Sequence, residues 1–289
     1  MNLFQLHDKR IDPSTGRMSS YFNQLFLLSG PDYFRYCILD TDRNTYIAMA
    51  DYQAEQKLAT PTSWQTEMEG LCLKDELLNR KYPAVVAGLE TPYHTILPAS
   101  LYDPGQLESH LRLNFEMPEG LIIHADQLTE MDAWNIWAVS PERQETLKNH
   151  FSQVILLHSS TALLKAFSMN LKQDSGHNII HLHFLRKRFD LAVLSDNTLR
   201  FFNTFHFDND EDILYFTLYA AEQLKLRSGE SCLRLSGDIE IASDTVGLLR
   251  EFLPETNFGS RPEGFGYSPL FDFPAHKYPS LFSLALCGS

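Results

Sequence analysis

The sequence predicts a two-lobed α/β protein in which one unit, three strands followed by helix, strand, helix, strand and helix, occurs twice. Three observations predict this fold class. Closely spaced apolar runs separated by turn residues appear twice, and each set is followed by alternating helical and strand patterns. The chain has 289 residues, which suits two lobes of ordinary size. Hydrophobic residues make up 44% of the sequence, enough for two sizeable cores.

The first lobe is predicted at residues 1–170. A short strand at Leu3–Leu6 and a polar lead precede a meander of three strands, expected at Asn23–Leu28, Tyr33–Leu39 and Thr45–Ala50. Both breaks in this meander consist of turn residues. A helix capped by Thr62 or Ser63 and ending near Arg80 comes next, followed by an apolar run at Ala84–Gly88 that is typical of a buried strand.

The segment 90–139 interrupts this rhythm and is interpreted as a small inserted subdomain. It is expected to contain strands at His94–Leu97, Gly120–Ala125 and Asn135–Val139, and a helix at Pro104–Phe115. The main rhythm then resumes with a helix after Ser140, a strand at Val154–Leu157 and a helix that begins at Ser159 or Ser160 and ends at Asn170.

The second lobe is predicted at residues 171–289, without an insertion. Its elements are expected as strands at Asn178–Phe184, Phe189–Leu194 and Leu199–Phe207, a helix at Asp210–Leu226, a strand at Cys232–Leu235, a helix at Ser243–Phe252, a strand at Thr256–Phe258 and a final helix from Pro279. A meander joined to such crossovers predicts a mixed five-stranded sheet flanked by helices in each lobe. A helix near 159–170 would join the lobes around a cleft.

Composition excludes several classes of function. The net charge of −13 argues against a general nucleic-acid binder and against docking on an anionic membrane. No apolar run is long enough to span a bilayer, and the first residues do not form a signal peptide, so we expect a cytoplasmic protein without membrane insertion. The four cysteines form no CxxC pair and are expected as buried, reduced thiols: Cys37, Cys72, Cys232 and Cys287.

The doubled unit resembles the actin-like ATPase superfamily, which has a ribonuclease H-like fold. The first half is similar to actin-like assembly proteins of type IV pili and to the cytoplasmic part of the type II secretion L protein. The residues that carry this resemblance are His94-Thr95-Ile96-Leu97-Pro98, the run Asn135–Glu142, and Ser159-Ser160-Thr161-Ala162-Leu163-Leu164. The whole chain also resembles an uncharacterised family from Bacteroidota to which this fold has been assigned.

The resemblance implies where a nucleotide would bind. In the superfamily two Gly-rich hairpin turns hold the phosphates, each with an Asp that helps to position Mg²⁺ and water, and a turn with paired glycines contacts the adenosine. Glycine lets backbone N–H groups approach phosphate, and carboxylate suits a hard cation. The corresponding positions here, interpreted as a vestigial cleft, are Ser29, Gly30, Arg186, Lys187, Arg188, Ser236 and Gly237.

These turns depart from the superfamily pattern. The first has one Gly, Leu28 or Ser29 where the Asp is expected, and Pro31, which lacks an N–H donor. The second has no Gly; its three basic residues are interpreted as a solvated hairpin tip, with an anion site as the alternative. The third keeps only Gly237. We therefore expect no catalytic residues and no cofactor, with ATP and Mg²⁺ as the alternative.

Three further patterns each have a structural and a functional interpretation. His181, His183 and His206 could share one sheet, but ordinary strand histidines are favoured over a metal site. The acidic run at 208–212 lacks the Gly and distal Glu of a calcium loop and is interpreted as helix capping. The aromatic residues of the tail are interpreted as a loop covering a lobe, with a partner surface as the alternative: Phe258, Phe265, Tyr267, Phe271, Phe273 and Tyr278.

The leading hypothesis is a non-catalytic member of this fold that acts as a scaffold or regulator through an unidentified protein partner, with self-association left open. The alternative is a nucleotide-binding ATPase with unusual phosphate loops. We expect the tip Arg186-Lys187-Arg188 to face the interlobe cleft. We also expect its replacement by alanines to leave folding intact, because a hairpin tip contributes little burial.

Overall fold

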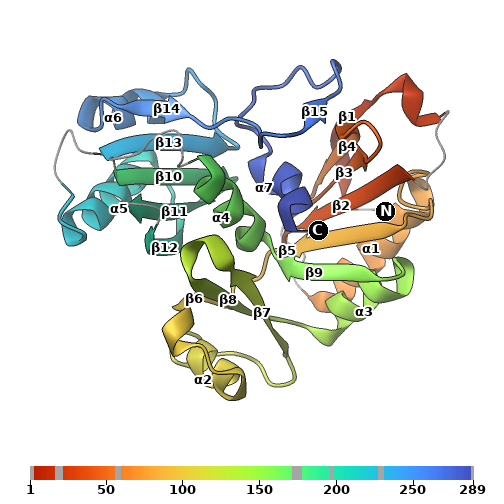
Figure 1. Ribbon diagram of the computed structural model, residues 1–289, viewed down its shortest axis with the longest axis horizontal. Helices are drawn as coiled ribbons and strands as arrows, with labels where there is room; N and C mark the ends of the chain where they lie inside the picture. Colours follow the sequence, from red (N-terminus) through yellow and green to blue (C-terminus); the bar gives the residue numbers. More distant parts are fainter. Residues whose placement is uncertain are drawn as a thin grey trace.

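The computed structural model describes residues 3–16, 22–55, 60–170, 178–195, 198–226 and 231–287 of the chain. Two lobes, each built on its own mixed sheet, lie side by side, and a smaller third sheet lies at the bottom of the view in Figure 1. In the described part of the chain no helix is both long enough and apolar enough to cross a membrane. The doubled α/β architecture is the one that the sequence predicts.

The first-lobe sheet has seven strands in the order β1–β4–β3–β2–β5–β9, with β15 paired to the start of β4. The strands are β1 (Gln5–Ile11), β2 (Asn23–Ser29), β3 (Tyr33–Asp40), β4 (Thr45–Gln53), β5 (Ala84–Leu89), β9 (Val154–His158) and β15 (Gly266–Tyr267). The meander β2–β3–β4 is antiparallel, whereas β5 and β9 continue the sheet in parallel from β2. The five strands predicted for this sheet are present. The short strand predicted at Leu3–Leu6 lies instead at Gln5–Ile11, as β1, and β15 adds a strand that was not predicted.

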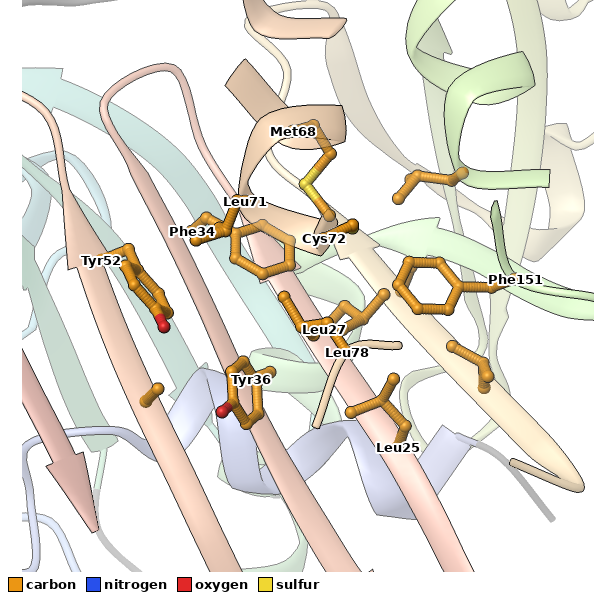
Figure 2. Packing of buried hydrophobic residues seen from close by; sticks show 14 of the residues in the cluster. Leu25, Leu27, Phe34, Tyr36, Tyr52, Met68, Leu71, Cys72, Leu78 and Phe151 are labelled. Atoms are coloured by element: carbon orange, nitrogen blue, oxygen red, sulfur yellow. The ribbon is translucent and has the colours of Figure 1, made fainter. Parts of the chain in front are cut away.

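Both faces of this sheet are buried because its central strands are apolar on both sides. Leu25 and Leu27 of β2 point to the core under helices α1 (Pro61–Lys74) and α3 (Pro141–His150), as Figure 2 shows for part of this cluster. Phe26 and Leu28 point to the opposite core. This alternation follows from the two-residue period of a strand.

Helix α1 differs from the prediction at both ends. Thr60 caps its start, with Pro61 in the first turn, and the helix ends at Lys74 instead of continuing to Arg80. The reason is Asp75, whose carboxylate enters the core and accepts hydrogen bonds from the hydroxyls of Tyr36 and Tyr52.

The segment at 90–139 contains a three-stranded antiparallel sheet of its own, with the order β6–β8–β7. Its elements are β6 (His94–Pro98), α2 (Leu107–Arg112), β7 (Ile122–Leu128) and β8 (Ala133–Val139). A small separate core holds it together, built from Leu111, Met117, Ile136 and Ala138. We call this unit the subdomain.

The second lobe has the predicted five-stranded mixed sheet, in the order β12–β11–β10–β13–β14. Its strands are β10 (Asn178–Leu185), β11 (Arg188–Ser195), β12 (Thr198–His206), β13 (Ser231–Gly237) and β14 (Thr256–Phe258). Helices α5 (Asp210–Gln223) and α6 (Asp244–Phe252) contribute to the core on one face. The acidic run caps α5: Asn209 and Asp212 form a capping box.

The two lobes exchange their last helices across the predicted boundary between residues 170 and 171. Helix α4 (Ser159–Asn170) follows the last crossover strand of the first lobe, yet Leu163, Leu164 and Phe167 pack against the second-lobe sheet. The tail after β14 returns to the first lobe, where α7 (Pro279–Phe282) and the 3₁₀ helix η7 (Ser283–Cys287) cover the sheet face formed by Phe26 and Leu28. Helices α4 and α7 lie side by side between the lobes (Figure 1).

Candidate functional site

The first predicted phosphate turn, between β2 and β3, is closed by packing. The Ser29 side chain is buried, and its Oγ accepts a hydrogen bond of 3.0 Å from the indole Nε1 of Trp64. A Cβ atom on Gly30 would lie 2.3 Å from the Tyr33 ring. Glycine is therefore required here by the neighbouring tyrosine, and Ser29 is turned toward α1.

The second predicted turn, between β10 and β11, contacts the first lobe directly. Arg186 Nη1 donates a hydrogen bond of 2.5 Å to the carbonyl oxygen of Ala54 and lies 3.8 Å from Asp32 Oδ2. Arg188 is only 4% exposed, and its Nη2 lies 2.5 Å from Glu90 Oε1. Lys187 is exposed.

The interpretation of all three basic residues as a solvated tip is therefore wrong for Arg188. The hairpin turn consists of two residues, so position 188 already belongs to β11, where the side chain points to Glu90 of the other lobe. For the same reason, we no longer expect the triple alanine replacement to leave folding unaffected.

The third predicted turn follows β13 and requires Gly237 for backbone reasons. Gly237 has a φ of +87°, and a Cβ atom there would lie 2.1 Å from the carbonyl oxygen of Phe184. Its N–H donates to the carbonyl of His276, and Ser236 Oγ lies 3.1 Å from Nδ1 of His183. These partners account for the conformation of the turn without a ligand.

Several ion pairs connect the lobes where the three turns meet, among them the two contacts of Asp32 with Arg186 and Arg188. Besides the pair between Arg188 and Glu90, Arg35 Nη2 in β3 lies 3.0 Å from Asp238 Oδ2 in the second lobe. The same guanidinium donates from Nε to Asp51 Oδ1 at 2.9 Å. Aromatic faces enclose it, because the Tyr33 and Tyr278 rings lie 4.7 Å and 5.2 Å from Arg35 Cζ.

The pKa directions agree with permanently charged pairs. Burial raises the pKa of Glu90, but Arg188, the Tyr33 hydroxyl and Arg143 outweigh that effect and bring the pKa below its ordinary value. Burial likewise opposes ionisation of Asp51, whose pKa is nevertheless lowered by Arg35. We call the pairs Arg188–Glu90 and Arg35–Asp238 the interlobe clamp.

Sequence reasoning missed the clamp, although a signal was present. Arg35 stands inside an otherwise apolar and aromatic strand run, and a charge at a central strand position requires a partner. Its interlobe partner Asp238 lies 203 positions further along the chain, and Glu90 lies 98 positions before its own partner Arg188, so pattern analysis alone does not connect either pair.

The histidines considered for a metal site do not converge. The buried His181 ring stacks on Phe167, with centroids 3.9 Å apart, while His183 lies between the hydroxyls of Ser236 and Ser280. Burial lowers the pKa of His181 to about 3 and that of His183 to about 4. Among the described residues, no group of three or more potential ligands could hold a metal ion.

A buried polar network lies at the start of α4. His158 Nδ1 is 2.7 Å from Ser160 Oγ, and that hydroxyl also accepts from Asn135 Nδ2 at 3.0 Å. Asp126 accepts from the Thr161 hydroxyl and from the His158 backbone N–H. Because Ser160 is only 3% exposed and is bound on both sides, the network ties α4 to the subdomain and does not present a nucleophile.

A cleft of about 1330 Å³ lies between the subdomain and the second lobe. Its walls come mainly from β6 and β12, and its inner end reaches Arg188 and Asp190. Burial raises the pKa of Asp190 to about 7, while Thr204 donates a hydrogen bond to its Oδ1 at 2.6 Å. The sequence predicted a cleft between the lobes that Arg188 faces, but not the part of it bounded by the subdomain, because that part depends on how the subdomain lies relative to β12.

Comparison with solved structures confirms the predicted fold and the predicted resemblance. A Bacteroides thetaiotaomicron VPI-5482 protein, described as having an actin-like ATPase fold and unknown function, is 18% identical with a TM-score of 0.72, and the match covers 83% of this chain and 91% of that one. The PilM–PilN type IV pilus biogenesis complex gives a chain that is 13% identical with a TM-score of 0.63, covering 92% and 98%.

A third match is the ethanolamine utilization protein EutJ of Carboxydothermus hydrogenoformans. It is 9% identical with a TM-score of 0.50, and the match covers 92% of this chain and 90% of that one. At these identities the likenesses show the fold alone. Comparison with curated proteins gives no match.

A family described as "Protein of unknown function (DUF3822)" matches residues 14–256, which is most of the chain. The chain therefore belongs to the DUF3822 family, and its fold is that of the actin-like ATPases.

Proposed function

We propose that this protein is a non-catalytic member of the actin-like fold that acts by binding another protein, as a scaffold or regulator. The observation that carries the proposal is the interlobe clamp. Arg188 and Glu90 come from the two lobes and meet where relatives place phosphate, according to the resemblance. A triphosphate could bind there only by separating this buried ion pair, and it would then need hydrogen-bond donors from the surrounding backbone.

The three turns offer few such donors. Gly30 N–H is bonded to the Tyr33 carbonyl, and Gly237 N–H is bonded to the His276 carbonyl. Of the carboxylates beside the turns, Asp32 and Asp238 face arginines and Asp190 accepts a hydrogen bond from the Thr204 hydroxyl. Without free N–H groups and a carboxylate available for Mg²⁺, the in-line geometry of phosphoryl transfer is not assembled.

Two observations support a cytoplasmic protein-binding role. The PilM chain, with a similar fold, is described in a complex with PilN. All four cysteines of the present chain are free thiols, and three of them are buried, which suits a reducing compartment. Cys287 differs from the prediction in being only half-buried.

An ATP hydrolysis assay tests the non-catalytic part. Phosphate release from ATP with Mg²⁺ should not exceed the buffer blank for the wild-type chain, nor for Arg188→Met, which removes one partner of the clamp. Mg²⁺-dependent release by the wild type would contradict the proposal. If Arg188→Met reduced that release while Lys187→Met did not, the active site would be at the clamp, and the chain would be an ATPase with unusual loops.

A further inference from the structure

The cleft between the subdomain and the second lobe is bordered by two strand edges. In the described part of the chain, β12 ends the five-stranded sheet and β6 ends the three-stranded one. In Figure 1, β12 lies at the lower side of the second lobe and faces the subdomain. The two strands approach each other at His94 and Phe202, whose rings lie 5.7 Å apart.

The hydrogen bonds of β12 show which backbone groups face the cleft. Phe207 N–H donates inward to the Lys187 carbonyl of the neighbouring hairpin, whereas Thr204 N–H donates to the side-chain oxygen of Asn203. Because antiparallel pairing alternates between inward and outward groups, the N–H groups of Phe202 and His206 point outward with that of Thr204. The outer edge of β12 therefore presents a row of backbone donors and acceptors. Another extended chain has complementary groups at the same spacing and can pair with them.

The side chains of β12 are unusual for a strand edge. Proteins generally blunt exposed edges by shortness, charge or proline. Strand β14 is three residues long, β1 carries Asp8, Lys9 and Arg10, and β6 ends in Pro98. By contrast, β12 has nine residues, Thr-Leu-Arg-Phe-Phe-Asn-Thr-Phe-His, with a single charged residue at Arg200. The subdomain lies opposite this edge, across the cleft.

The lining of the cleft suits an extended chain with apolar side chains. Ile96, Leu199 and Phe202 pack at the edge of a core cluster and remain partly exposed, and Met131 lies beside them. The cleft exceeds the roughly 300–1,000 Å³ of pockets for small ligands. At about 3.3 Å per residue, β12 offers an edge roughly 30 Å long.

We propose that an extended segment of a partner protein binds in this cleft by adding a strand to the outer edge of β12, with apolar side chains at alternate positions facing Ile96 and Phe202. Main-chain hydrogen bonds give such a complex its affinity, and side-chain contacts on alternate residues give its specificity. The inference rests on the proposed function, because it takes a protein as the ligand. It adds the site and the conformation of the bound segment.

The test uses peptides of about 12 residues, long enough to span β12, selected from a random phage-displayed library on the intact chain. Each selected peptide is resynthesised with single backbone N-methyl groups. We expect N-methylation to abolish binding at every second position and to be tolerated between them, because alternate N–H groups of an added strand face β12.

Two variants at one position isolate the backbone contribution. His206→Ala removes the exposed imidazole but keeps the outward N–H, whereas His206→Pro removes both. A proline with its nitrogen on the free side of an edge strand leaves the ladder with β11 intact. We expect His206→Ala to change peptide affinity less than about twofold and His206→Pro to weaken it at least about fivefold, the effect of one hydrogen bond.

Amide hydrogen exchange on the unmodified chain provides a readout that does not depend on the folding of a variant. Bound peptide should slow exchange at Phe202 and His206. The inference is overturned if no peptide is selected, if N-methylation shows no alternation, if protection falls elsewhere, or if the bound peptide is helical. ATP binding or turnover would contradict the non-catalytic proposal but would leave these results unaffected, so the two failures are distinguishable.

Discussion

Replacing Arg188 with methionine should destabilise the protein far more than the same change at Lys187, the preceding residue on the same hairpin. The Arg188 side chain is 5% exposed and the Glu90 side chain 16%, so both charges are largely removed from water. Methionine keeps much of the aliphatic volume of arginine but leaves the Glu90 carboxylate without its closest cation.

The expected loss follows from what Glu90 retains. Removing one partner of a buried ion pair costs about 3–5 kcal/mol. Glu90 would keep the Tyr33 hydroxyl, 2.8 Å away, so we expect the lower end, about 3 kcal/mol. In the double variant Arg188→Met/Glu90→Met the Glu90 carboxylate is no longer stranded, so the loss should be smaller than in Arg188→Met. The Tyr33 hydroxyl still loses its partner, at a cost of about 1 kcal/mol, and Asp32 and Arg143 each lose one neighbouring opposite charge.

Urea unfolding followed by circular dichroism at pH 7 measures these differences. Lys187→Met is the matched control, because Lys187 is exposed, and its effect should stay within about 0.5 kcal/mol of zero. The difference in the free energy of unfolding between Arg188→Met and wild type should become smaller in acid. The pKa of Glu90 is lower in the folded protein than in the unfolded chain. The ion pair therefore stabilises the folded state fully above the unfolded pKa of about 4.3, and this contribution is lost as the pH falls below that value. Equal effects of Arg188→Met and Lys187→Met would refute the reasoning.

Three further predictions concern other parts of the chain. The free energy of unfolding of Asp190→Asn, relative to wild type, should increase by at least about 1 kcal/mol between pH 4.5 and pH 8. The reason is that the buried carboxyl of Asp190 has a pKa of about 7 and must lose its proton inside the fold as the pH rises. The same difference at both pH values would count against this prediction. Gly237→Ala should cost at least about 2 kcal/mol in the same assay, since its φ is +87° and its Cβ would overlap the Phe184 carbonyl; near-wild-type stability would contradict the described turn. Phe282→Ala should cost about 3–5 kcal/mol, because this buried ring packs on Tyr46 on one face of the first-lobe sheet. A small effect would mean that α7 does not belong to that core.

The element order was predictable because local signals mark it. Turn residues such as Gly30 and Pro31 separate apolar strands, and Ser140 followed by Pro141 begins a helix in the expected way. The destination of the tail was not predictable. Aromatic residues such as Phe271 and Phe282 show that the tail is buried, but nothing local tells which of two apolar sheets they cover.

The candidate site shows a similar division. The structure has turns at the three positions that the sequence indicated, after β2, between β10 and β11, and after β13. The sequence did not distinguish Arg188 from Lys187, because that depends on a two-residue turn that places one side chain in solvent and the other against Glu90. Such long-range pairing follows from the relative position of the lobes, which local patterns do not encode.

The central claim is that the interlobe clamp occupies the phosphate position, and thermal unfolding with and without ATP and Mg²⁺ tests it most directly. A ligand present at 100 times its dissociation constant stabilises a folded protein by about 2.7 kcal/mol. We expect the unfolding midpoint of the wild-type chain to be the same with saturating ATP and Mg²⁺ as without nucleotide. A rise in the midpoint with ATP that depends on Mg²⁺ and disappears in Gly237→Ala would contradict it.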